Sequence, residues 1–337
     1  MGSVGYRVLA ALLVAGCSLG LAACQEQQPP TDGRAVHFTA AGDMGMGAGA
    51  RSVLEVVSGL RPDFNIALGD LSYKAGAEQD YCDVVTSKLG EDFAYELIAG
   101  NHESDGSEGD IDVFAGCLPN RLQGLQGTYG RQWYVDIPLD KPLVRMILVS
   151  PGLEFKDKDE FDYSRGSERY KWTEAAIDGA REANVPWTIV AMHVPCFSLG
   201  HYGCEAGQPL TNLLISKKVD LVLTAHEHAY QRSHQLGING ACPWIFSGSA
   251  VRSCIASTES QVTSGKGTIF AGVGTGGAGE HDLSGDDPEA PYFAAWSAAN
   301  RNPALGTLDV HITEGRLDAR FVPVSESGFM DHFSVVK

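Results

Sequence analysis

Five short motifs of metal-ligating residue types follow apolar runs of the chain, and they constrain its fold more than any other feature. In order, they are Gly42-Asp43-Met44-Gly45, Gly69-Asp70-Leu71-Ser72-Tyr73, Gly100-Asn101-His102-Glu103, His193 and His226-Glu227-His228. A glycine before a ligand lets the backbone turn sharply and approach an ion closely. Taken singly, each motif also fits an ordinary turn, a helix cap or a buried histidine. Together they predict a metal site.

The apolar runs alternate with amphipathic stretches, which is typical of an α/β domain. We expect strands at Val36–Ala41, Phe64–Leu68, Tyr95–Ala99, Val144–Val149, Trp187–Met192 and Asp220–Leu223, and helices at Arg51–Leu60 and Glu168–Ala183. After Ala241 the pattern indicates only strands and turns, with candidates at Ile269–Val273, Leu308–Ile312 and Leu317–Val322. Each motif then comes just after a strand. Ligand groups converge at the carboxyl ends of strands in such sheets, so we expect the motifs to meet.

The motif set resembles that of the calcineurin-like metallophosphoesterases, and Tyr73 narrows the resemblance to the purple acid phosphatase branch. Further likeness lies in Gly166-Ser167-Glu168-Arg169-Tyr170-Lys171-Trp172, in Ala229-Tyr230-Gln231-Arg232 and in Gly272-Val273-Gly274-Thr275-Gly276-Gly277, and it covers roughly residues 36–335. The resemblance implies a four-layer α/β/β/α sandwich that forms a single catalytic domain over residues 35–337. Because the first motif begins just after the expected tether, we expect no counterpart of the amino-terminal fibronectin-like domain of the larger plant enzymes.

The resemblance also implies a ligand set for two metal ions. Asp70 would bridge the ions, since a carboxylate offers two oxygens. Asp43, Tyr73 and His228 would complete the first site, and Asn101, His193 and His226 the second. His226 and His228 are two residues apart, so extended backbone places both side chains on one side. A phenolate from Tyr73 favours Fe(III), and the second site suits Fe(II), Zn(II) or Mn(II).

The implied activity is that of an acid phosphatase, in which a metal-bound hydroxide attacks a phosphate monoester. His102 would donate a hydrogen bond or proton to the leaving oxygen. His201 is the candidate for a second substrate histidine, although its spacing from His193 is one residue short of the related forms, and an exposed surface histidine is the alternative. Ala225 stands where the family has glycine before the histidine pair, and we expect only a local adjustment there.

Other functions remain open on the same residues. A phosphodiesterase or nucleotidase would share this dinuclear scaffold, and a non-catalytic protein could use it to bind phosphate or metal. The β-lactamase type of dinuclear zinc site needs His-x-His-x-Asp-His, but Ala229-Tyr230-Gln231 follows the histidine pair here. The formal G-x-G-x-x-G at Gly272, Gly274 and Gly277 is not followed by a helix pattern, so a loop near the active site is expected instead of a dinucleotide site.

Charge limits the partners that we expect. The formal net charge is −17, so most of the surface would repel nucleic acid. A small phosphate ester is still compatible, because bound cations make a cleft locally positive. The oligomeric state cannot be read from the sequence.

The N-terminus predicts export. Arg7 precedes an apolar run over residues 8–15, and Leu21-Ala22-Ala23-Cys24 resembles a bacterial lipobox. We therefore expect a lipoprotein-type signal peptide at 1–23, a flexible tether at 24–34 and a secreted or cell-surface protein held to the membrane only by a possible lipid on Cys24. Ordinary secretion without a lipid is the alternative.

Six further cysteines suggest disulfides, because an even number in an exported protein is typical of them. They are Cys82, Cys117, Cys196, Cys204, Cys242 and Cys254. Of the 15 possible connectivities, we favour pairing of nearest neighbours, namely 82–117, 196–204 and 242–254.

Overall fold

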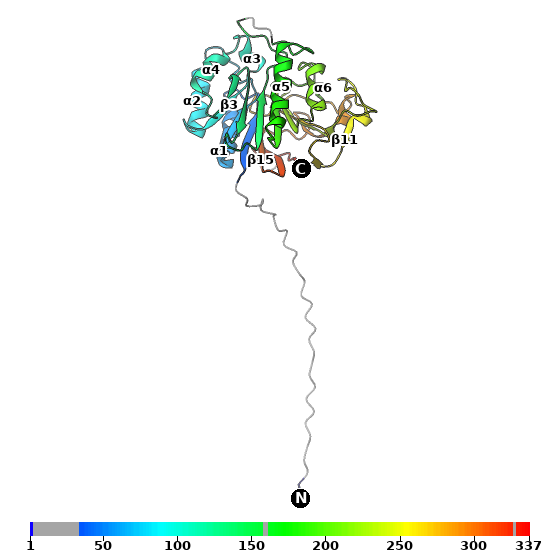
Figure 1. Ribbon diagram of the computed structural model, residues 1–337. Helices are drawn as coiled ribbons and strands as arrows, with labels where there is room; N and C mark the ends of the chain where they lie inside the picture. Colours follow the sequence, from blue (N-terminus) through cyan, green and yellow to red (C-terminus); the bar gives the residue numbers. More distant parts are fainter. Residues whose placement is uncertain (3–33, 158–160, 326–327) are drawn as a thin grey trace. The chain divides into compact units, whose positions relative to one another are not determined.

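Two large mixed sheets form the centre of the fold in the computed structural model, which describes residues 1–2, 34–157, 161–325 and 328–337 (Figure 1). The seven-stranded sheet has the order β12-β17-β16-β15-β1-β2-β3, and the eight-stranded sheet has the order β14-β9-β13-β8-β7-β6-β5-β4. The strands are β1 (Val36–Ala41), β2 (Phe64–Ala67), β3 (Ala94–Leu97), β4 (Gln126–Thr128), β5 (Gln132–Ile137), β6 (Val144–Leu148), β7 (Trp187–Ala191), β8 (Leu221–Thr224), β9 (Tyr230–Ser233), β10 (Gln235–Leu236), β11 (Ile255–Ser257), β12 (Gln261–Thr263), β13 (Ile269–Val273), β14 (Phe293–Ser297), β15 (Gly306–Ile312), β16 (Arg316–Pro323) and β17 (His332–Val336).

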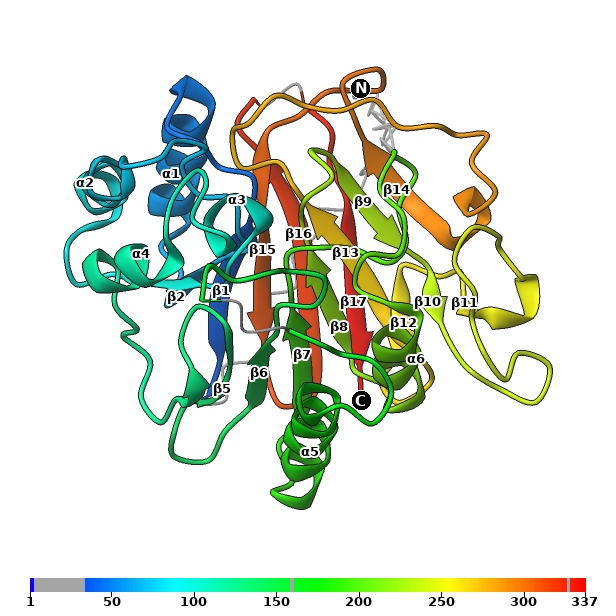
Figure 2. The same ribbon diagram turned by 90° about the horizontal axis from the view of Figure 1, so that it is seen from above.

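Helices cover the outer faces of both sheets. They are α1 (Ala48–Leu60), α2 (Glu78–Leu89), α3 (Asn101–Ser104), α4 (Ile111–Cys117), α5 (Glu168–Glu182) and α6 (Gln208–Ser216). Helix α1 packs on the seven-stranded sheet through β15, and α5 packs on the eight-stranded sheet through β6. Figures 1 and 2 show α1 and α2 on one side of the sheets, and α5 and α6 on the other. The order of layers is α/β/β/α, as expected, and residues 34–337 form one compact unit.

The parallel strands at the centres of both sheets are largely buried on both faces. Every residue of β2, β6, β7 and β8 is buried, which explains why these segments are continuous apolar runs. Strands β1, β2 and β3 are parallel neighbours, as are β6, β7 and β8. Parallel pairing brings their carboxyl ends to one edge of each sheet, and this edge carries the motifs.

Two details correct the element bounds expected from the sequence. The strand expected at 64–68 ends at Ala67, because Leu68 turns its carbonyl oxygen toward the ring of His193, 2.7 Å from Nδ1. The helix expected at 51–60 begins at Ala48. Helix α5 begins as expected, because Ser167 caps it by accepting from the backbone N–H of Tyr170.

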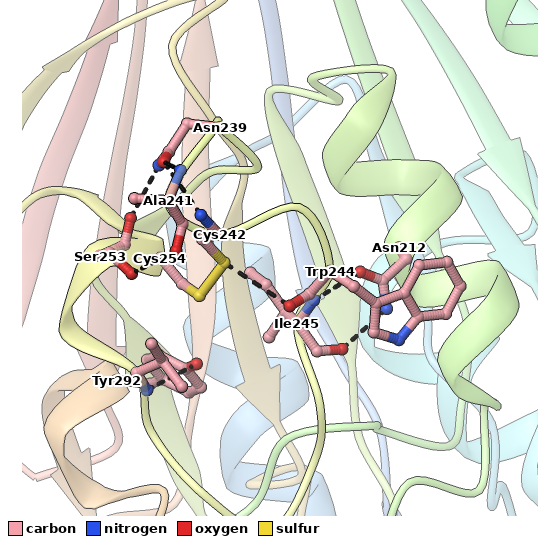
Figure 3. The surroundings of a disulfide bond; sticks show 10 residues. Asn212, Asn239, Ala241, Cys242, Trp244, Ile245, Ser253, Cys254 and Tyr292 are labelled. Atoms are coloured by element: carbon pink, nitrogen blue, oxygen red, sulfur yellow. Dashed lines mark hydrogen bonds between the residues drawn. A yellow bond between two sulfur atoms is a disulfide. The ribbon is translucent and has the colours of Figure 1, made fainter.

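Three disulfides connect nearest neighbours in sequence, Cys82–Cys117, Cys196–Cys204 and Cys242–Cys254. This confirms the favoured pairing. Figure 3 shows the surroundings of the Cys242–Cys254 disulfide, beside which the side-chain amide of Asn239 donates to the carbonyl oxygen of Ser253. The expected signal peptide, Cys24 and almost all of the tether lie outside the described residues. No helix in the described ranges is long and apolar enough to span a bilayer.

Candidate metal centre

The structure brings the predicted ligand residues together at the carboxyl ends of the strands. Asp43 follows β1, Asp70 and Tyr73 follow β2, and Asn101 is the first residue of α3 after β3. From the other sheet, His193 follows β7, and His226 and His228 follow β8. The two sheets therefore supply opposite walls of one site.

Asp43, Asp70 and His228 form one group, in which one ligand atom from each lies within 4.8 Å of the others. The hydroxyl of Tyr73 joins them, 3.1 Å from Oδ1 of Asp43 and 2.9 Å from Nε2 of His228. These are the residues expected at the first metal site.

Asp70, His193 and His226 form a second group by the same criterion, and all three are buried. Nε2 of His193 lies 3.1 Å from Oδ1 of Asn101, 3.1 Å from Nδ1 of His226 and 3.3 Å from Oδ1 of Asp70. Asp70 is thus common to both groups, which is the position required of a bridging carboxylate.

The hydrogen bonds behind the histidines test whether these residues fit metal ions. Nδ1 of His193 lies 2.7 Å from the carbonyl oxygen of Leu68, and Nδ1 of His228 lies 2.7 Å from that of Gly279. Each Nδ1 must therefore carry the proton, and Nε2 of a neutral ring presents a lone pair to the site. Lone pairs from imidazole, carboxylate and amide groups then face one another at about 3 Å, and cations would relieve their repulsion. The residues fit a pair of ions.

The pKa shifts of the buried groups point the same way. Burial opposes ionisation of Asp70, but His193 and His102 outweigh burial and lower the pKa of Asp70 well below its usual range. Burial also opposes protonation of His193, but the carboxylate of Asp70 outweighs it and raises the pKa of His193. Burial and the carboxylates of Asp43 and Asp70 raise the pKa of Tyr73 far above its usual range. Positive charge between these groups is strongly favoured.

The backbone is shaped to bring the ligands inward. Asp43, Asp70, Tyr73 and His226 have φ between 54° and 68°, the left-handed region that non-glycine residues seldom adopt and that is common at functional sites. Gly100 leaves room for the bridge, because a Cβ there would lie 2.1 Å from Oδ1 of Asp70.

Small residues also let the surrounding loops pack closely. A Cβ on Gly274 would lie 2.5 Å from Oδ2 of Asp43, so the glycine-rich segment after β13 is a loop beside the site, as expected. The side chain of Ala225 fits against the backbone of Gly42, because Gly42 has no side chain. A Cβ on Gly42 would lie 2.5 Å from that of Ala225.

Glu103 connects the loop that carries Asp70 to the loop that carries Asn101. Its buried carboxylate accepts from the backbone N–H groups of Asp70 at 2.9 Å, of Leu71 at 3.2 Å and of Gly100 at 2.7 Å. Although Glu103 belongs to one of the motifs, no local pattern indicates this positioning role.

His102 lies at the open side of the site. Nε2 of His102 is 3.6 Å from Oδ2 of Asp70, and its side chain is 31% exposed. Nδ1 lies 2.6 Å from Oε2 of Glu108, which fixes the orientation of the ring. His102 therefore presents Nε2 where a ligand of the ions would reach it.

His201 lies on the opposite rim, where its side chain is 62% exposed and Nδ1 is 3.5 Å from Oε1 of Glu227. Its neighbour Tyr202 packs its ring on His226, with centroids 3.7 Å apart. The sequence missed His281, whose ring stacks on His228 with centroids 4.1 Å apart. It also missed Glu205, whose Oε2 lies 3.2 Å from Nε2 of His226.

Two sheets lie between outer helices, and two groups of ligand residues that share Asp70 lie at the strand ends. This combination is that of a metallophosphoesterase with a dinuclear site. The family profile described as calcineurin-like phosphoesterase matches residues 36–230. This chain belongs to that family.

Several proteins similar to this chain are purple acid phosphatases. Purple acid phosphatase 18 of Arabidopsis thaliana is 25% identical over 210 residues, covering 60% of this chain and 45% of that protein. Fe(3+)-Zn(2+) purple acid phosphatase 12 of the same plant is 26% identical over 298 residues, covering 81% and 57% respectively. The chain thus spans about half the length of these curated relatives.

A solved purple acid phosphatase from yellow lupin (Lupinus luteus) seeds has the same fold. It superimposes with a TM-score of 0.65 at 17% identity, over 91% of this chain and 55% of that one. A dimetal phosphatase from Danio rerio superimposes with a TM-score of 0.56 at 11% identity, over 89% of this chain and 98% of that one.

Proposed function

We propose that this protein is an exported acid phosphatase that hydrolyses phosphate monoesters at a dinuclear metal centre. The observation that carries the proposal is that Asp70 belongs to both groups of ligand atoms. A single carboxylate between two donor sets is what a two-metal phosphoesterase requires.

The ligands divide between the two ions as the family resemblance implies. Asp43, Tyr73 and His228 would hold one ion, Asn101, His193 and His226 the other, and Asp70 both. When bound, the two cations would lower the pKa of a water molecule and neutralise charge on the phosphate oxygens. The phenol of Tyr73 supports Fe(III) in the first site, since a hard anionic oxygen suits a trivalent ion. Fe(II), Zn(II) or Mn(II) would suit the second, and one similar protein is named for iron and zinc.

The groups of the chain itself would orient the ester and supply the proton. Glu108 fixes Nδ1 of His102 at 2.6 Å, so Nε2 of His102 is free to hydrogen-bond the leaving oxygen and to protonate it as the ester bond breaks. Asn101 would help to hold the second ion, and the exposed ring of His201 would contact the leaving group.

The experiment compares hydrolysis of p-nitrophenyl phosphate by iron- and zinc-loaded wild type, His102→Asn and His311→Asn. His311 is a matched control, because it is a histidine with a 51% exposed side chain on another face. We expect His102→Asn to lose about 10²–10⁴-fold in kcat with two ions still bound, and His311→Asn to match the wild type. Metal-replete wild type that cleaves no phosphate ester at any pH would favour a non-catalytic binding protein instead.

The same assay with bis(p-nitrophenyl) phosphate separates the other candidate. A higher kcat/KM for the diester than for the monoester would indicate a phosphodiesterase on the same centre. Export is supported by three disulfides, which persist in oxidising compartments. Anchoring through a lipid on Cys24 remains part of this proposal.

A further inference from the structure

A buried carboxylate, Glu227, lies between the two proposed metal ligands of the His226-Glu227-His228 motif. Its side chain is 1% exposed. Within the described ranges its ion-pair partners are histidines, and no lysine or arginine pairs with it. A buried carboxylate is costly unless positive charge compensates it. For Glu227 this charge must come from the histidines or from a bound cation.

The two oxygens of Glu227 have different neighbours. Oε2 accepts from the hydroxyl of Ser198 at 3.0 Å and from the backbone N–H of Tyr202 at 3.5 Å. Oε1 instead faces two imidazole nitrogens, Nδ1 of His281 at 2.8 Å and Nδ1 of His201 at 3.5 Å. Neutral donors thus fix the carboxylate so that its second oxygen points between two histidines.

We propose that His201, Glu227 and His281 form a third cation site, separate from the dinuclear centre, for a divalent ion of the zinc class. One ligand atom from each residue lies within 4.8 Å of the others. Two imidazoles and one carboxylate form a typical zinc donor set when a fourth position is open. The exposure of His201 opens the site to solvent, which leaves that fourth position to water or to an oxygen of a ligand.

A second cluster on the outer face of the seven-stranded sheet shows what distinguishes Glu227. His37, Asp309 and His311 also offer two imidazoles and a carboxylate within 4.8 Å. There, however, Nε of Arg320 donates to Oδ2 of Asp309 at 2.8 Å. The guanidinium already supplies the compensating charge, and a cation would have to compete with it. Among the residues that the structure describes, Glu227 has no such partner.

The third site would lie directly beside the dinuclear centre. The ring of His281 is stacked on that of His228 at an interplanar angle of 12°, and Tyr202, next to His201, covers His226. A cation there would bind the lone pair of Nδ1 of His281, which lies 2.8 Å from Oε1 of Glu227 and 3.3 Å from the backbone N of His228, and it would compete with a proton for that nitrogen. It would add positive charge beside His226 and His228.

The test counts bound zinc. Metal-free protein is equilibrated with Zn²⁺ at free concentrations set by a chelator, separated from free metal, and analysed by mass spectrometry for zinc per chain. The variants are His201→Gln, His281→Gln and Asp70→Asn, with His311→Gln as the matched control. His201→Gln changes an exposed side chain, so it keeps the test valid if His281→Gln does not fold.

We expect three ions in the wild type and in His311→Gln. His201→Gln and His281→Gln should keep two ions and bind the third at least about 10-fold more weakly, whereas Asp70→Asn should keep only the third. The third site is wrong, and the proposed dinuclear function stands, if the wild type binds only two ions, Asp70→Asn loses both, and His201→Gln and His281→Gln retain both. If the wild type binds one ion that Asp70→Asn retains and His281→Gln loses, the third site stands and the dinuclear function fails.

Discussion

Replacement of Glu103 by glutamine should weaken both the fold and the metal centre. Oε1 of Glu103 accepts from two backbone N–H groups, those of Asp70 and Gly100, and Oε2 accepts from that of Leu71. A glutamine can place its one carbonyl oxygen at the Oε1 position and keep two bonds. Its amide NH₂ then faces the N–H of Leu71, so two donors meet and the bond from Leu71 is lost.

The expected cost follows from that lost bond. Burial and the carboxylate of Asp70 raise the pKa of Glu103 to about 8, so near neutral pH the lost bond is one to a neutral group. Such a bond contributes about 0.5–1.5 kcal/mol, and Glu103→Gln should lower the free energy of unfolding by about 1 kcal/mol. The change also loosens the loops that carry Asp70 and Asn101. Loss of an outer partner of metal ligands typically costs about 10–100-fold in metal affinity, and we expect a loss in that range for zinc.

Urea unfolding of the metal-free protein and chelator competition for zinc measure the two effects separately. Glu289→Gln is the matched control, because the buried carboxylate of Glu289 accepts from the backbone N–H groups of Ser198 and Gly248 and touches no ligand loop of the dinuclear centre. Glu289 reaches the centre only indirectly, because Ser198 also donates to Glu227. The control should therefore lose similar stability and much less zinc affinity at the dinuclear pair than Glu103→Gln. Unaltered zinc affinity in Glu103→Gln would refute the positioning role.

Three further changes test separate parts of the structure. Tyr73→Phe should abolish the visible absorption band of iron-loaded protein, because the phenolate would no longer bind Fe(III); an unchanged spectrum would rule out that assignment. Burial raises the pKa of Glu96 to about 7, so its contribution to stability is present below pH 4.5 and is lost as pH rises through 7. Between pH 4 and pH 8.5, the free energy of unfolding of Glu96→Gln, measured in urea, should therefore rise by about 3 kcal/mol relative to that of the wild type. An equal pH dependence of both proteins would contradict this. Mass spectrometry of the native N-terminus should find an acyl group on Cys24, and its absence would refute the anchor.

Much of the centre was predictable because its ligands come from strand ends. Buried parallel strands are recognisable as apolar runs, and the residue after each run lies at a known edge of the sheet. Asp43, Asp70, His193 and His226 therefore lie just after strands, as the sequence predicts. The same logic gave the helix at 168–183 within one residue of α5.

The residues that the sequence missed lie on loops, where position depends on long-range contacts. His281 reaches His228 only because its backbone N–H donates to the carbonyl oxygen of His228 at 2.9 Å, across 53 residues. Glu205 is placed beside His226 by the loop that the Cys196–Cys204 disulfide closes. No local spacing encodes such contacts.

Some helices were missed for a different reason. Helix α2 is mostly polar and presents only Tyr81, Cys82, Val84 and Val85 to the core, so its period is weak. Helix α6 is the opposite case, because its residues 210–215 are all buried. A short apolar run of that kind cannot be distinguished from a strand by periodicity.

Anomalous diffraction from crystals of iron- and zinc-loaded protein, recorded at the absorption edges of both metals, tests the central claim most directly. We predict two peaks about 3.5–4 Å apart, both within bonding distance of Asp70, with iron on the side of Tyr73. A single peak, or two peaks of which either lies away from Asp70, would contradict it.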